Sequence, residues 1–76
     1  MKKETTVNII TGIITKLYPL VEPEINTDLK QYDLDSLDLL ELVMEIEKEF
    51  DINIEEEDYE KLKTVSDFAD FVISKK

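Results

Sequence analysis

The sequence has neither cysteine nor histidine among its 76 residues. Without cysteine the chain can form no disulfide bond, no thiolate metal site and no cysteine nucleophile. Without histidine it lacks the usual general base near neutral pH and the commonest metal ligand. These two absences argue against most classes of enzyme.

Basic residues are also scarce, because 9 lysines stand against 19 acidic residues and give a formal net charge of −10. Nucleic acids and anionic membrane surfaces are bound through lysine and arginine, so this charge argues against both as partners. No apolar run approaches the roughly 20 residues that span a bilayer, and no A-x-A cleavage pattern follows the start. We expect a cytoplasmic monomer whose partners are basic proteins.

The negative charge is concentrated in the middle of the chain. Residues 31–60 hold thirteen acidic side chains and one lysine, whereas residues 1–30 are neutral overall and residues 61–76 are basic. A solvated face that keeps a small domain soluble is one explanation, but this concentration favours a recognition surface. Calcium loops starting at Asp33 or Asp51 lack the central glycine and the closing glutamate of an EF-hand. We therefore expect no dedicated metal site.

Apolar residues that recur with a helical period predict an all-α fold. The predicted helical segments lie near residues 4–18, 28–32, 36–50, 55–62 and 65–74. Pro19 ends the first of them, and Thr64 with Asp67 predicts a capped start for the last. We expect one domain over residues 1–76, a small four-helix bundle with a long loop from Tyr18 to Asp35.

The segment 36–50 carries two apolar stripes when it is wound at about 100° per residue. The stripe assigned to the core consists of Leu39, Leu42, Val43, Ile46 and Phe50. The second stripe consists of Leu37, Leu40 and Met44, bordered by Glu41 and Glu47. Either this second stripe is an exposed docking surface, or its residues pack at the core boundary and beneath the next loop. The periodicity alone does not decide between them.

Ser36 begins this segment, with Asp35 as the predicted N-cap and Asp38 as its partner three residues on. A serine here is ordinarily part of the cap. A hydroxyl at a helix N-terminus is also a good attachment point for phosphate, because amide groups and the helix dipole stabilise negative charge there. No histidine is present to activate Ser36 as a hydrolase nucleophile, so another protein would have to attach the phosphate.

The run Asp35-Ser36-Leu37-Asp38, followed by the acidic segment up to Phe50, resembles the acyl carrier protein family. The resemblance covers about residues 28–73. It implies that Ser36, flanked by Asp35 and Leu37, bears 4′-phosphopantetheine, which a separate phosphopantetheinyl transferase takes from coenzyme A. The thiol of that arm then holds an acyl group as a thioester, so the chain would be a carrier and no enzyme.

The same resemblance implies that the helix starting at Ser36 docks on basic patches of partner enzymes. The implied docking residues are Asp38, Leu40, Glu41, Met44 and Glu47. The implied partners are the transferase and the acyl-transferring and condensing enzymes of fatty acid or related polyketide-like synthesis. The core around the first apolar stripe would shelter the acyl chain.

One position departs from the family, which commonly has glycine where this chain has Asp33. Glycine adopts a positive φ at no steric cost, whereas aspartate does so only moderately well. Either the loop takes a different path here, or the chain is a specialised carrier. The sequence also leaves two alternatives to an acyl carrier open: a peptidyl, aminoacyl or aryl carrier, and an adaptor of the same fold that is never modified.

Overall fold

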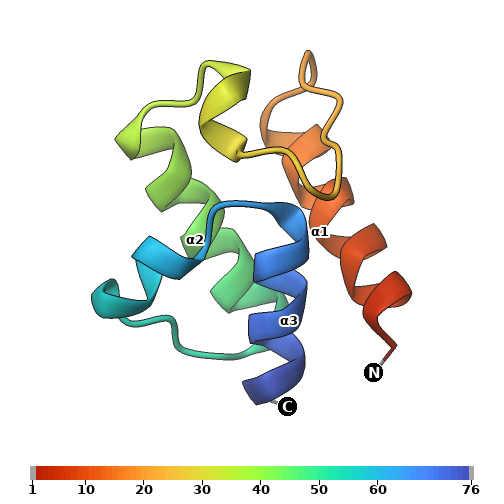
Figure 1. Ribbon diagram of the computed structural model, residues 1–76, viewed down its shortest axis with the longest axis vertical. Coiled ribbons are helices and arrows are strands. Elements are labelled where there is room, and N and C mark those ends of the chain that lie inside the picture. Colours follow the sequence, from red (N-terminus) through yellow and green to blue (C-terminus); the bar gives the residue numbers. More distant parts are fainter. Residues whose placement is uncertain (1, 76) are drawn as a thin grey trace.

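The computed structural model describes residues 2–75, and within them every regular element is helical (Figure 1). The elements are α1 (Lys3–Leu17), η1 (Leu29–Tyr32), α2 (Ser36–Phe50), η2 (Glu56–Lys61) and α3 (Val65–Lys75). The predicted all-α bundle is confirmed, and each segment lies within two residues of its predicted bounds. The two short elements, η1 and η2, are 3₁₀ helices.

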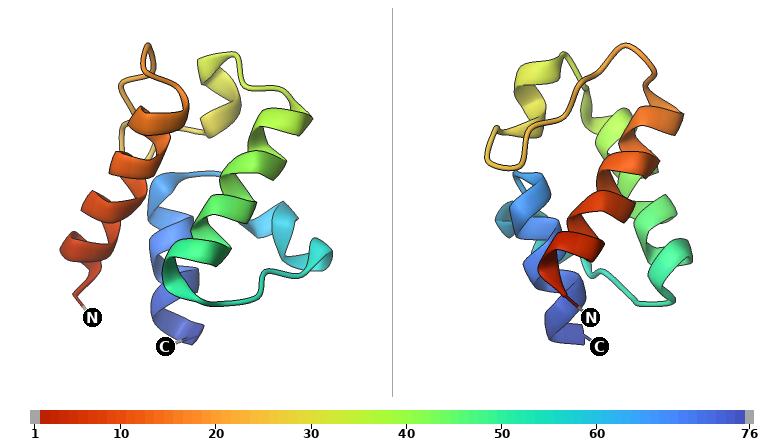
Figure 2. Two further views of the ribbon diagram at one scale, coloured as in Figure 1. Left: turned by 180° about the vertical axis from the view of Figure 1, so that it is seen from behind. Right: turned by 90° about the vertical axis from the view of Figure 1, so that its right-hand side faces the viewer.

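The three long helices run alongside one another, with α1 antiparallel to α2 and α3 (Figures 1 and 2). The long loop after α1, which contains η1, crosses one end of the bundle. The connection from α2 to α3 returns along the side of the bundle away from α1 and contains η2. The start of α2 therefore lies at the same end as the long loop, and the pocket described below lies between α2, η1, η2 and the start of α3.

The core lies where the apolar faces of the three long helices meet. Its fully buried side chains include Ile10, Ile14, Leu42, Ile46, Val65 and Phe68. Four of the five residues of the predicted core stripe on α2 are buried. The fifth, Leu39, is half-buried: it packs against the core and also lines the pocket described below.

The long loop is fastened to the start of α3 by backbone hydrogen bonds. The amide of Leu29 donates to the carbonyl of Lys63 at 2.8 Å, and the amide of Ser66 donates to the carbonyl of Ile25 at 3.0 Å. Leu29 itself is buried, which adds an apolar anchor at the beginning of η1. These contacts hold η1 beside the entrance to the pocket. Within residues 2–75, no helix combines the length and the apolar character that crossing a bilayer requires.

Candidate functional site

The start of α2 is fixed by a capping box, as predicted. The carboxylate of Asp35 accepts a hydrogen bond from the amide of Asp38 at 2.9 Å. In return, the carboxylate of Asp38 accepts one from the amide of Asp35 at 3.2 Å. Asp35 is thus the N-cap, and Ser36 is the first residue of the helix.

Ser36 has no part in that cap. Its side chain is exposed, and the hydrogen bonds that close the box belong to Asp35 and Asp38. The explanation of Ser36 as a mere capping residue is therefore wrong in this structure. What the fold presents is an exposed hydroxyl at a helix N-terminus, where unpaired amide groups and the helix dipole favour a phosphate.

The backbone just before this site turns through Asp33. Residue 33 ends η1 in the left-handed region, with φ 65° and ψ 27°. This is a conformation that glycine adopts freely and that aspartate tolerates at some cost. Asp33 therefore adopts a backbone conformation typical of glycine. Holding an aspartate in this conformation costs free energy locally, at the turn. The next residue, Leu34, is buried and anchors the chain before it reaches Asp35.

Tyr18 links the end of α1 to the first turn of α2, a contact that the sequence pattern did not reveal. Its hydroxyl donates a hydrogen bond of 2.6 Å to the backbone carbonyl of Asp38. Burial raises the pKa of Tyr18 to about 12, and the negative charge of Glu41, followed by that of Asp38 and Asp35, adds to the shift. Only Pro19, which ends α1 just beyond it, indicated from the sequence that this residue lies at a helix end.

The second apolar stripe of α2 is exposed to solvent. The exposed fractions are 75% for Leu37, 41% for Leu40 and 59% for Met44, and the carboxylate of Glu41 is exposed among them. The possibility that Met44 packs beneath the next loop is therefore wrong, whereas Leu40 borders the pocket at the edge of the core and is also open to solvent. We refer to Leu37, Leu40, Glu41 and Met44 together as the outer face of α2.

Two other acids assigned to docking are engaged within the chain. The carboxylate of Asp38 belongs to the capping box. The carboxylate of Glu47 accepts a hydrogen bond of 2.8 Å from the amide of Ile54 and so ties α2 to the segment that leads into η2. Both side chains are half-buried. Their contribution to docking stays a prediction. Within residues 2–75 both carboxylates make a hydrogen bond, whereas the Glu41 carboxylate makes none.

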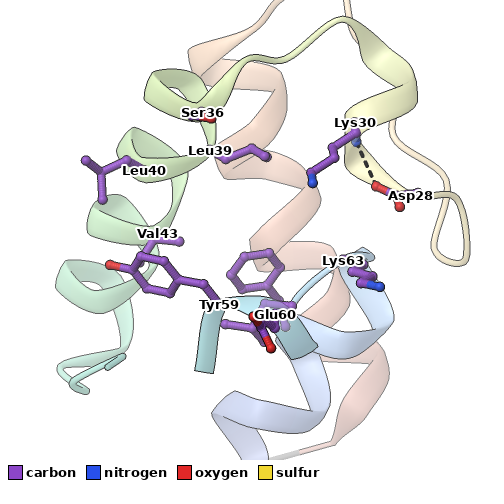
Figure 3. A pocket seen from close by; sticks show the side chains of 11 residues that line it. Asp28, Lys30, Ser36, Leu39, Leu40, Val43, Tyr59, Glu60 and Lys63 are labelled. Carbon is purple, nitrogen blue, oxygen red and sulfur yellow. Dashed lines mark hydrogen bonds between the residues drawn. The ribbon is translucent and has the colours of Figure 1, made fainter. Parts of the chain in front are cut away.

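A pocket of about 610 Å³ opens beside Ser36 (Figure 3). Its apolar wall consists of Leu39, Leu40, Val43, Leu62 and Phe68. Tyr59 faces α2 across the opening (Figure 3). Ser36 itself lines the rim, so a group attached to its hydroxyl would begin at the entrance to an apolar cavity.

Comparison with known proteins identifies the family. The family model described as "Phosphopantetheine attachment site" matches residues 8–72. An acyl carrier protein of Buchnera aphidicola is 45% identical over 69 residues, which cover 87% of each chain. The chain belongs to the acyl carrier protein family.

Other relatives match over different lengths. An acyl carrier protein of Cyanophora paradoxa is 34% identical over 74 residues, 93% of this chain and 72% of that protein. An acyl carrier protein of Bdellovibrio bacteriovorus is 58% identical over 41 residues, which are 54% of this chain and 53% of the relative. This last match thus spans about half the length of the curated relative.

The prosthetic group of this family's domain is 4′-phosphopantetheine, and acyl carrier proteins are carriers that catalyse no reaction themselves. The residues around Ser36 fit such a group, because they combine an exposed hydroxyl with a helix N-terminus and an adjoining apolar pocket. When bound, the group supplies a thiol, which the cysteine-free chain does not have.

Proposed function

We propose that Ser36 carries 4′-phosphopantetheine and that the chain presents acyl thioesters on this arm to enzymes of fatty acid or related polyketide-like biosynthesis. The observation that carries the proposal is the exposed Ser36 hydroxyl, which the capping box leaves free at the rim of an apolar pocket. Membership of the acyl carrier family supports it.

Loading requires one substitution at phosphorus. The Ser36 oxygen forms the new bond to the phosphorus of coenzyme A that carries the pantetheine, and the bond from that phosphorus to the nucleotide part breaks. The proton of the hydroxyl passes to a base at the transferase site. The amide groups at the start of α2 stabilise the attached phosphate.

The pocket suits the cargo of such a carrier. Val43, Leu62 and Phe68 are buried side chains of its wall, and moving apolar surface out of water is favourable by roughly 25 cal/mol per Å². An acyl chain that enters between α2 and the start of α3 would leave water there. It would also be protected until a partner enzyme draws it out.

Ser36→Ala tests the attachment. The wild-type chain, Ser36→Ala and Ser74→Ala are incubated with a phosphopantetheinyl transferase of broad specificity, coenzyme A and Mg²⁺, and their intact masses are compared. Ser74 is an exposed serine of α3 and serves as the matched control. We expect the wild type and Ser74→Ala each to gain one phosphopantetheine and Ser36→Ala to gain none. A loaded Ser36→Ala chain, or an unloaded wild type, contradicts the assignment.

The outer face of α2 is proposed as the docking surface for the transferase and for acyl-transferring and condensing enzymes with basic patches. An exposed apolar strip beside a carboxylate is suited to such a patch. Glu41→Lys should raise the KM of loading several-fold, mainly through slower association. Glu4→Lys is the control, because it makes the same charge change on α1. Equal KM values for the two variants would place the docking surface elsewhere.

The class of cargo is tested by acylation of the loaded chain. Fatty acyl activating enzymes and aminoacyl or aryl activating enzymes are offered the same preparation. We expect a thioester from the fatty acyl enzymes alone. Transfer by the aminoacyl or aryl enzymes alone would make the chain a carrier of a specialised pathway. A chain that is never loaded in its own cell would be an adaptor of the carrier fold.

A further inference from the structure

A lysine of η1 points into the mouth of the pocket. Lys30 is held at its backbone by Asp28, whose carboxylate accepts a hydrogen bond of 2.9 Å from the Lys30 amide. Its side chain extends from η1 toward Leu39 of α2, across the opening whose rim Ser36 shares (Figure 3). The cation and the attachment hydroxyl thus border the same entrance from two different elements.

The ammonium group of Lys30 lacks a partner in the part of the chain that the structure describes. The ion pairs formed there join Lys3 to Asp70 and Lys48 to Glu45. Asp28 uses its carboxylate on the Lys30 amide, and the Lys30 side chain extends away from it (Figure 3). The ammonium group of Lys30 is therefore available to an anion held at the entrance to the pocket.

A phosphodiester on Ser36 would be that anion. The acids Asp35 and Asp38 stand beside Ser36 at the start of α2, and they repel a negative charge on that side. Lys30 attracts it from the side of the pocket, and an ammonium group bound to a phosphate oxygen forms a charge-assisted hydrogen bond.

We propose that Lys30 binds the phosphodiester on Ser36 and thereby directs the arm into the pocket between α2 and the start of α3. This inference rests on the proposed attachment at Ser36. It makes Lys30 a residue that determines how much of the time the arm thiol is sheltered. Because the Lys30 side chain is exposed, salt should weaken the contact.

Thiol accessibility and phosphorus NMR test this role. The wild type, Lys30→Gln, Lys30→Arg and Lys63→Gln are each loaded, and loading is verified by intact mass. The reaction of the arm thiol with an uncharged maleimide is then timed at low and high salt, and the ³¹P shift of the phosphodiester is recorded. Lys63 is the charge control, because it lines the same pocket while its ammonium points away from α2 (Figure 3).

We expect Lys30→Gln to speed the thiol reaction roughly two- to fivefold at low salt, the factor typical of one partly exposed ion pair. The difference should shrink at high salt. The ³¹P shift should move in Lys30→Gln, while Lys30→Arg and Lys63→Gln stay close to the wild type. Wild-type behaviour of Lys30→Gln, or equal effects in Lys63→Gln, would overturn the inference. A wild-type chain that accepts no arm would instead overturn the proposed function.

Discussion

Replacing Tyr18 by phenylalanine removes a single hydrogen bond between α1 and the first turn of α2. The lost contact is the 2.6 Å bond from the Tyr18 hydroxyl to the carbonyl of Asp38. A buried or half-buried hydrogen bond contributes about 0.5–1.5 kcal/mol net. For a domain of this size, a loss of ~1 kcal/mol lowers the Tm by about 4–8 °C. We expect this change in urea and thermal unfolding followed by circular dichroism.

The pH dependence of the same variant gives a sharper signature. Burial raises the pKa of Tyr18 to about 12 in the folded chain, above the ordinary value near 10 in the unfolded chain. A raised pKa favours the neutral phenol in the fold, so its contribution is complete below pH 10 and is lost as the pH rises through 12. The gap between the wild type and Tyr18→Phe should therefore close over that range.

Tyr59→Phe is the control for Tyr18→Phe. Tyr59 lines the pocket and is 36% exposed, so removing its hydroxyl should change the free energy of unfolding by less than about 0.5 kcal/mol. Every other side chain is the same in the wild type and in Tyr18→Phe, so its response to pH cancels in the difference. A Tyr18→Phe chain as stable as the wild type at pH 7 would refute the reasoning. A gap that stays constant from pH 9 to 12 would refute the role assigned to the hydroxyl.

Three further predictions concern stability. Gly12→Ala should raise the free energy of unfolding by ~0.5–1 kcal/mol, because a methyl group at this position of α1 meets no atom within 4 Å; an unchanged urea midpoint would contradict it. Asp33→Ala should destabilise the fold by about 1 kcal/mol, whereas Asp33→Gly should not. Equal urea midpoints for these two variants would argue against a left-handed conformation at residue 33. Added salt or millimolar divalent cation should raise the Tm by screening the repulsion within residues 31–60, whereas a flat titration would show that this charge is not strained.

The helices could be predicted because their signals are local. The period of Val7, Ile10 and Ile14 in α1 dictates which face is buried. The cap formed by Thr64 and Asp67 also follows from four adjacent residues, and the structure contains both of its hydrogen bonds. The 3₁₀ geometry of η2 was not predictable in this way, since a segment of six residues has too few turns for the pattern to separate the two helix types.

The surroundings of the site depend on contacts between distant residues, which a pattern does not record. The hydrogen bond from Tyr18 joins residues 20 positions apart. Periodicity placed Glu47 beside the apolar stripe but gave no sign of its bond to Ile54. A docking test that reverses Glu47 would therefore also disturb the fold, which is why Glu41 is the better position.

The central claim is that Ser36 bears an arm that holds an acyl thioester. The most direct measurement is the intact mass of the chain isolated from its own cell, before and after hydroxylamine, followed by mapping of the modified peptide. We expect a mass that exceeds the bare chain by one phosphopantetheine and an acyl group, a loss of the acyl group with hydroxylamine, and an arm that maps to Ser36. A chain that has only its unmodified mass in that cell, or an arm on another serine, would contradict the account.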